Sequence, residues 1–135
     1  MQRSLRRDLT NAGTWAAIWF AGAMLVGGVI GIVDPDSIDP GDTAGMAMVM
    51  GLMAVLSGAV FAALLRVADP RPVGPRMSKA LACGFMATAL VQTALLGHGD
   101  AGLMANLGMA LVMCAFGVVV TVCWLALRRS QTTPR

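Results

Sequence analysis

Carboxylates form the densest group of chemically capable side chains in this sequence. Four aspartates fall between positions 34 and 42, namely Asp34, Asp36, Asp39 and Asp42. Clustered carboxylates are ligands that Ca²⁺ prefers, but the spacing of an EF-hand loop and its closing Glu are missing. The repeated Asp-Pro units and the Pro-Gly pair fit consecutive turns, in which Asp side chains accept hydrogen bonds from nearby backbone N–H groups. We interpret the segment as a series of turns. A weak divalent-cation site and a docking surface for a partner are the alternatives.

Methionine is the second group with chemical potential, since the chain contains 11 of them. Helical spacing places Met46, Met50 and Met53 on one face, and Met109 and Met113 on another. Thioethers are soft ligands suited to Cu(I), so a copper path is one reading. Methionine is also the flexible filler of apolar packing, and we favour this second interpretation.

The remaining candidates do not form a recognisable active site. The single histidine, His98, lies in a polar connection, and Cys83, Cys114 and Cys123 lack any CxxC spacing. The apolar segments contain only neutral polar residues, which are Ser57, Thr88, Gln92, Thr93, Asn106 and Thr121. Proton-coupled transporters place an ionisable group near mid-membrane, so we expect no proton-coupled transport. We predict an interhelical hydrogen bond between Gln92 and Asn106, and no catalytic, cofactor-binding or metal-ligating residue.

The elements that carry these residues are four long apolar segments. The chain is 57% hydrophobic and 13% charged, which is outside the range of a soluble domain. The segments cover residues 13–33, 44–65, 80–97 and 103–127, and a membrane-spanning helix needs about 20 such residues. Short connections favour neighbours of opposite direction. We therefore predict an all-α membrane protein, an antiparallel bundle of four transmembrane helices in a single domain over residues 1–135.

The charges predict the direction of these spans. All 10 basic residues flank the predicted spans in three clusters, which are Arg3/Arg6/Arg7, Arg66/Arg71/Arg76/Lys79 and Arg128/Arg129/Arg135. Basic residues in short loops stay on the cytoplasmic side, so both termini are expected inside. Such residues attract anionic lipid headgroups, and their placement argues against a nucleic-acid footprint. Trp15, Trp19 and Trp124 lie near the same ends, where we expect their rings at the headgroup boundary.

Small residues recur along each predicted span. These seams are Ala23/Gly27/Gly31, Gly51/Ala54/Gly58/Ala62, Ala80/Gly84/Thr88/Gln92 and Ala110/Cys114/Gly117/Thr121. In lipid, helices associate through close backbone approach and a few polar contacts, which small residues permit. The seams predict either a compact bundle or contacts with another subunit.

The Asp34–Asp42 segment also carries a resemblance. Together with the hydropathy pattern, it resembles uncharacterised small bacterial integral membrane proteins of four spans that have a DPDSIDPG-type outer loop. The resemblance implies the four-span topology and a bacterial inner (cytoplasmic) membrane, and it implies no activity.

The leading functional hypothesis is a non-enzymatic accessory, assembly or scaffold subunit of a membrane complex. Its partner would be another membrane protein or a second copy of the chain. The alternative is a small channel or transporter for an uncharged or soft solute, such as copper carried by methionines. A membrane-embedded enzyme ranks third, because catalysis needs positioned acids, bases or nucleophiles.

Overall fold

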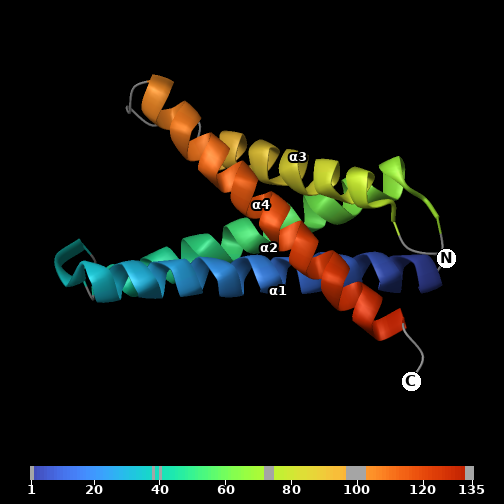
Figure 1. Cartoon of the computed structure of the whole chain (residues 1–135), viewed down its shortest axis with the longest axis horizontal. Coiled ribbons are helices and arrows are strands. Elements are labelled where there is room, and N and C mark those ends of the chain that lie inside the picture. The colour runs from blue at the N-terminus through green and yellow to red at the C-terminus, as the bar shows by residue number, and fades with distance from the viewer. Residues whose placement is uncertain (1, 38, 40, 72–74, 97–102, 133–135) are drawn as a thin grey trace.

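The computed structural model of the chain describes residues 2–37, 39, 41–71, 75–96 and 103–132. In this range the long elements are all helices, which are α1 (Gln2–Val33), α2 (Thr43–Ala68), α3 (Met77–Leu96) and α4 (Leu103–Thr132), with a 3₁₀ turn at Pro35–Ser37. All four helices are long and apolar enough to cross a membrane. In Figure 1, α2 lies between α1 and α3, and α4 packs along α3 and crosses α1.

Proline sets several helix boundaries. α1 ends at Val33 and α2 at Ala68, each directly before an Asp-Pro pair, because the residue before a proline is pushed away from helical geometry. The sequence also predicts N-caps, namely Asp42 for α2, Ser78 for α3 and Asp100 for α4, and these caps do not form where the structure describes them. Asp42 makes no side-chain hydrogen bond to α2, since its own backbone is already helical. Ser78 lies inside α3, which begins one residue earlier. Asp100 lies outside the described residues.

Aromatic rings fill the centre of the bundle. Trp15 stacks on Phe61 at 5.1 Å, and Phe61 meets Trp124 edge-on at 5.3 Å. Trp15 and Trp19 are 0% exposed and Trp124 is 2% exposed. The expectation that these three rings face lipid headgroups is therefore wrong. They face inward, because rings of this size fill the space between α1, α2 and α4.

The small-residue seams of α3 and α4 interlock. An added Cβ at Gly84 would collide with Thr121 Oγ1, and one at Gly117 would collide with Thr88 Oγ1. Each threonine therefore fills the space above the glycine of the facing helix, and each hydroxyl donates to a carbonyl one turn back in its own helix. Trp15 Nε1 from α1 also donates to Thr121 Oγ1 at 3.1 Å. The two threonine–glycine contacts fix how closely α3 and α4 approach each other.

In the α2 seam Ala54, Gly58 and Ala62 are buried, and Gly58 lies against the backbone of Ala12 in α1. The seam predicted in α1 is not used in this way. An added Cβ at Gly27 meets no described atom within 4 Å, and the buried residues of α1 are Asn11, Trp15, Ala16 and Trp19. Close packing is therefore concentrated around the N-terminal half of α1.

Candidate functional site

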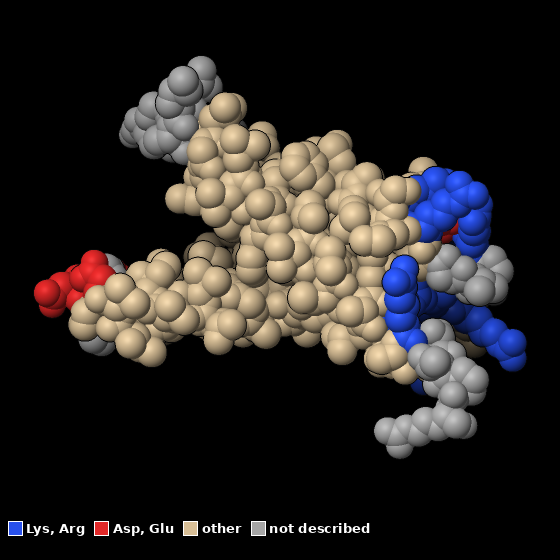
Figure 2. All heavy atoms as spheres, in the orientation of Figure 1, with Lys and Arg blue, Asp and Glu red and all other residues tan. Residues whose placement is uncertain are grey.

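Basic side chains gather at one end of the molecule, the end at which α1 begins and α4 ends in Figure 1. Figure 2 shows the basic residues at this end and acidic residues of the Asp34–Asp42 segment at the other. Nine of the ten basic residues fall within the described ranges and lie at this end. Asp8 and Asp69 are the only acidic residues that the structure describes at the same end. The local excess of positive charge is therefore large.

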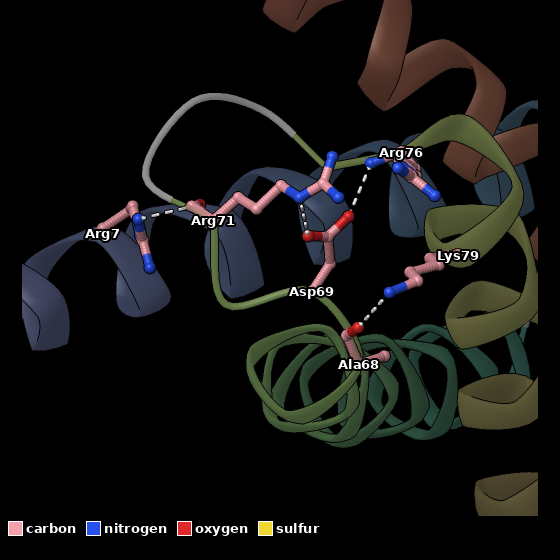
Figure 3. A network of polar contacts seen from close by, with 6 residues as sticks. All are labelled: Arg7, Ala68, Asp69, Arg71, Arg76 and Lys79. Carbon is pink, nitrogen blue, oxygen red and sulfur yellow. Dashed lines mark hydrogen bonds and ion pairs between the residues drawn. The ribbon is translucent and has the colours of Figure 1, made fainter.

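Asp69 organises the connection between α2 and α3 (Figure 3). Its side chain is 1% exposed. Oδ2 accepts a hydrogen bond from the backbone N–H of Arg76 at 2.8 Å, and Oδ1 lies 3.6 Å from Arg71 Nε, an ion-pair distance too long for a hydrogen bond. Lys79 Nζ donates to the carbonyl of Ala68 at 2.9 Å. These contacts hold the two ends of the connection together.

The pKa of Asp69 is lowered from its ordinary value of 3.8. The backbone hydrogen bond from Arg76 is the largest cause, and the charges of Arg71 and Lys79 act in the same direction against the effect of desolvation. Asp69 is thus a permanently ionised brace near neutral pH, and its role is structural. Sequence reasoning missed this residue, although one acid inside a basic proline-rich connection was a visible signal.

Two further contacts attach α1 to this end. Asp8 lies 3.5 Å from Arg66 of α2, and Arg7 donates to the carbonyl of Arg71 at a long 3.4 Å. The Arg66 side chain is 61% exposed, so the ion pair contributes little to stability. Asp8 is thus paired with Arg66, as Asp69 is paired with Arg71.

An open cavity of about 480 Å³ separates the first turns of α1 from the last turns of α4. We name it the basic wedge. It is lined by Arg3, Arg6, Arg7, Thr10, Asn11, Thr14, Trp124, Leu127, Arg128 and Gln131. Four of these residues are arginines and none of the lining residues is acidic. Such a cavity can attract and hold an anion.

α1 and α4 pack closely where they cross. Trp15 bonds to Thr121, Trp19 meets Phe116 edge-on at 5.5 Å, and Gly22 lies directly against Phe116. On one side of this crossing the helices separate to form the basic wedge. On the other side the α1–α2 pair and the α3–α4 pair diverge, and Figure 2 shows the notch between them.

The notch has apolar walls. Leu25, Val26 and Val29 follow Gly22 at helical spacing and continue its side of α1, yet they are 70%, 50% and 53% exposed. On α4, Met109 and Val112 precede Phe116 at the same kind of spacing and are 58% and 64% exposed. We name these five residues the apolar wedge.

The aspartates of the Asp34–Asp42 segment behave in part as predicted. Asp39 Oδ1 accepts a hydrogen bond from the backbone N–H of Gly41 at 3.0 Å, which is the local turn contact expected for Asp in this segment. The hydroxyl of Thr43 donates to the carbonyl of Asp39 at 3.3 Å. In the part of the chain that the structure describes, no three His, Cys, Asp or Glu side chains converge on a common point. His98 lies outside that part.

The other predicted residues are dispersed. Met53 is buried, whereas Met46 and Met109 are 53% and 58% exposed, so these three do not share one path. Ser57 and Gln92 are buried, and neither Ser57 Oγ nor Gln92 Oε1 has a hydrogen-bond partner among the described residues. The Asn106 side chain lies outside the described set, so the bond between Gln92 and Asn106 stays a prediction.

The cysteines and the last polar residue of the spans complete the list. Cys83 and Cys114 are buried and Cys123 is exposed, each as a free thiol. Thr93 donates to the carbonyl of Ala89 in its own helix at 2.8 Å.

No protein family, curated protein or solved structure matches the chain.

Proposed function

We propose that this protein is a non-enzymatic accessory or assembly subunit of a membrane complex, and that its apolar wedge receives a transmembrane helix of a partner protein. The observation that carries the proposal is the apolar wedge itself. Five apolar side chains at the α1/α4 divergence are at least half exposed, although their spacing places them on the sides by which the two helices meet at the crossing.

A helix is the occupant that this wedge fits. Lipid is as apolar as a helix surface, so association in a membrane depends on close packing and shape rather than on hydrophobicity. Gly28 of α1 and Gly108 of α4 lie in the same stretches of these helices as the residues of the apolar wedge. An added Cβ at either glycine meets no described atom within 4 Å. Such glycines let another backbone approach closely.

The filled centre favours this role over a channel within one copy of the chain. Trp15, Trp19 and Phe61 are 0% exposed and occupy the space where a path would run. Asp69, the buried acid at the basic end, is engaged by Arg76 and Arg71, and the cavity that it lines has a volume of only about 20 Å³. We accordingly propose no enzymatic activity and no proton-coupled transport.

We also propose a location for the protein and an orientation of its helices in the membrane. Alternating spans would place both termini and the basic wedge at the cytoplasmic face of a bacterial inner membrane, and the Asp34–Asp42 segment at the outer face. The separation of basic and acidic side chains between the two ends supports this direction.

The test is purification in a neutral detergent with quantification of associated membrane proteins. Val29→Trp and Val112→Trp each place a large ring in the apolar wedge, whereas Val55→Trp makes the same change on α2. The three valines are 53%, 64% and 63% exposed, so none of the changes disturbs the core. The parent and Val55→Trp should retain a partner at fixed stoichiometry, and the two wedge variants should lose it.

Two results would contradict the proposal. One is a partner that is retained equally by all three variants, which would place the interface elsewhere. The other is a parent that purifies as an oligomer of itself alone, which would favour the transporter alternative.

A further inference from the structure

The basic wedge is built from one stripe on each of two helices. Arg3, Arg6, Arg7 and Thr10 of α1 stand at helical spacing, and Trp124, Leu127, Arg128 and Gln131 of α4 do the same. Membrane topology requires basic residues at this end, but it does not require that four arginines line one cavity. The arrangement therefore needs a second explanation.

The electrostatics of the wedge favour an anion. Four guanidinium groups line one cavity, and the two carboxylates of this end are engaged elsewhere, Asp8 with Arg66 and Asp69 with Arg76 and Arg71. α1 begins here with no acidic residue in its first turn, so the positive end of its helix dipole is not compensated by its own side chains. Arginine presents several N–H donors in a fork that matches the oxygens of a phosphate group.

The wedge also has an apolar wall, formed by Trp124 and Leu127. Arg128 lies over the ring of Trp124 at 5.1 Å, so the cationic and apolar parts of the cavity are continuous. Thr10, Asn11 and Thr14 add neutral hydrogen-bonding groups beside the arginines. The volume of about 480 Å³ falls within the ~300–1,000 Å³ of small-molecule sites.

We propose that the basic wedge binds the phosphate-bearing headgroup of an anionic membrane phospholipid. The arginines hold the phosphate, the neutral polar residues contact the glycerol part of the headgroup, and the acyl chains leave along Leu127, which is 49% exposed, into the bilayer. A soluble phosphate compound would make only the contact between its phosphate and the arginines. The site is separate from the apolar wedge and does not depend on the proposed partner.

The test uses the full chain in a neutral detergent at physiological salt. Native mass spectrometry would count bound lipid as phosphatidylglycerol is titrated at a low mole fraction, with phosphatidylcholine of the same acyl chains and glycerol phosphate as the two comparisons. Phosphatidylglycerol should bind as a single retained molecule, and the zwitterionic lipid and the soluble phosphate should bind at least about tenfold more weakly.

A matched pair of variants separates a site from general attraction. Arg3→Gln with Arg6→Gln removes two charges from the wedge, and Arg76→Gln with Arg129→Gln removes two charges from the same end outside it. All four side chains belong to exposed residues, and the bond from Arg76 to Asp69 uses the backbone, so both variants should fold. The wedge variant should lose about tenfold or more in lipid affinity, because it loses two arginines that contact the phosphate, and the control should lose about twofold or less.

Equal losses in the two variants would overturn the proposal, because they indicate diffuse attraction to the whole basic end. Equal binding of the two lipids would overturn it as well. Glycerol phosphate that competes at the same concentration as the lipid would overturn the lipid assignment and identify a soluble phosphate compound as the ligand. None of these outcomes bears on the Val29 and Val112 experiment.

Discussion

Replacing Gly117 by Ala should destabilise the bundle, because the new methyl group would enter the tightest contact between α3 and α4. An added Cβ there collides with Thr88 Oγ1, and it lies only 3.0 Å from Thr88 Cβ and 3.1 Å from the carbonyl oxygen of Gly84. The Thr88 hydroxyl is held by its own bond to Gly84. None of these neighbours is the end of a flexible chain, so α3 and α4 must move apart.

The magnitude follows from two opposing terms. Inserting a methyl group into a packed core costs about 1–3 kcal/mol, and removing a glycine from a helix gains about 0.8–1 kcal/mol. Gly108→Ala on the same helix is the matched control, since an added Cβ there meets no described atom within 4 Å. The helix term is common to both variants. The difference in unfolding free energy between them should therefore be about 1–3 kcal/mol, with Gly117→Ala the less stable.

The assay is reversible unfolding in mixed micelles of a neutral detergent and SDS, followed by circular dichroism and by the fluorescence of the three tryptophans. Trp15, Trp19 and Trp124 are buried, so their emission reports the loss of the packed centre. Combining Gly117→Ala with Thr88→Ala should return part of the lost stability, because the side chains are in contact and their effects are coupled. Equal stability of Gly117→Ala and Gly108→Ala would refute the interlocked packing of α3 and α4.

Three other predictions address the polar contacts and the topology. Thr121→Val removes the acceptor of the buried Trp15 N–H and should cost about 1–3 kcal/mol in the same unfolding assay; unchanged stability would contradict the bond. Because the pKa of Asp69 lies below its ordinary 3.8 in the folded protein, ionised Asp69 contributes stability above that value, and the contribution is lost as the pH falls through the lower folded value. Acidification from pH 6 toward and below the ordinary value should thus lower the melting temperature of the parent more than that of Asp69→Asn, and parallel curves would argue against the brace. A cysteine introduced at Ser37 should react with an impermeant thiol reagent in intact cells and one at Ser130 should not, whereas the reverse pattern would invert the proposed topology.

Local features of the sequence were sufficient to predict the four long helices and part of their packing. Four apolar stretches between basic and acidic connections predicted four long apolar helices, because the need to satisfy backbone groups in lipid leaves few other structures. The predicted end of the first span at residue 33 agrees with α1, whereas α2 continues to Ala68, beyond the predicted end at residue 65. The small residues at Gly58, Gly84 and Gly117 marked real contacts, since only small side chains permit such close approach.

The direction in which each apolar face points was decided only by the tertiary structure. Lipid and protein core are equally apolar, so hydropathy does not distinguish the buried Trp19 from the exposed Leu25. The sequence pattern likewise placed Gly27 in a packing seam, whereas the structure leaves it in open space.

The crossing of α1 and α4 likewise depends on the shapes of Trp15, Trp19, Phe116 and Thr121 acting together. No local pattern encodes that angle, because it arises from side chains about a hundred positions apart in the chain meeting in three dimensions. The sequence by itself therefore determined that there are four long apolar helices and at which end the basic residues gather. The tertiary structure decided that α1 and α4 cross and then diverge on both sides of the crossing. This divergence places the basic wedge at one end and the apolar wedge at the other.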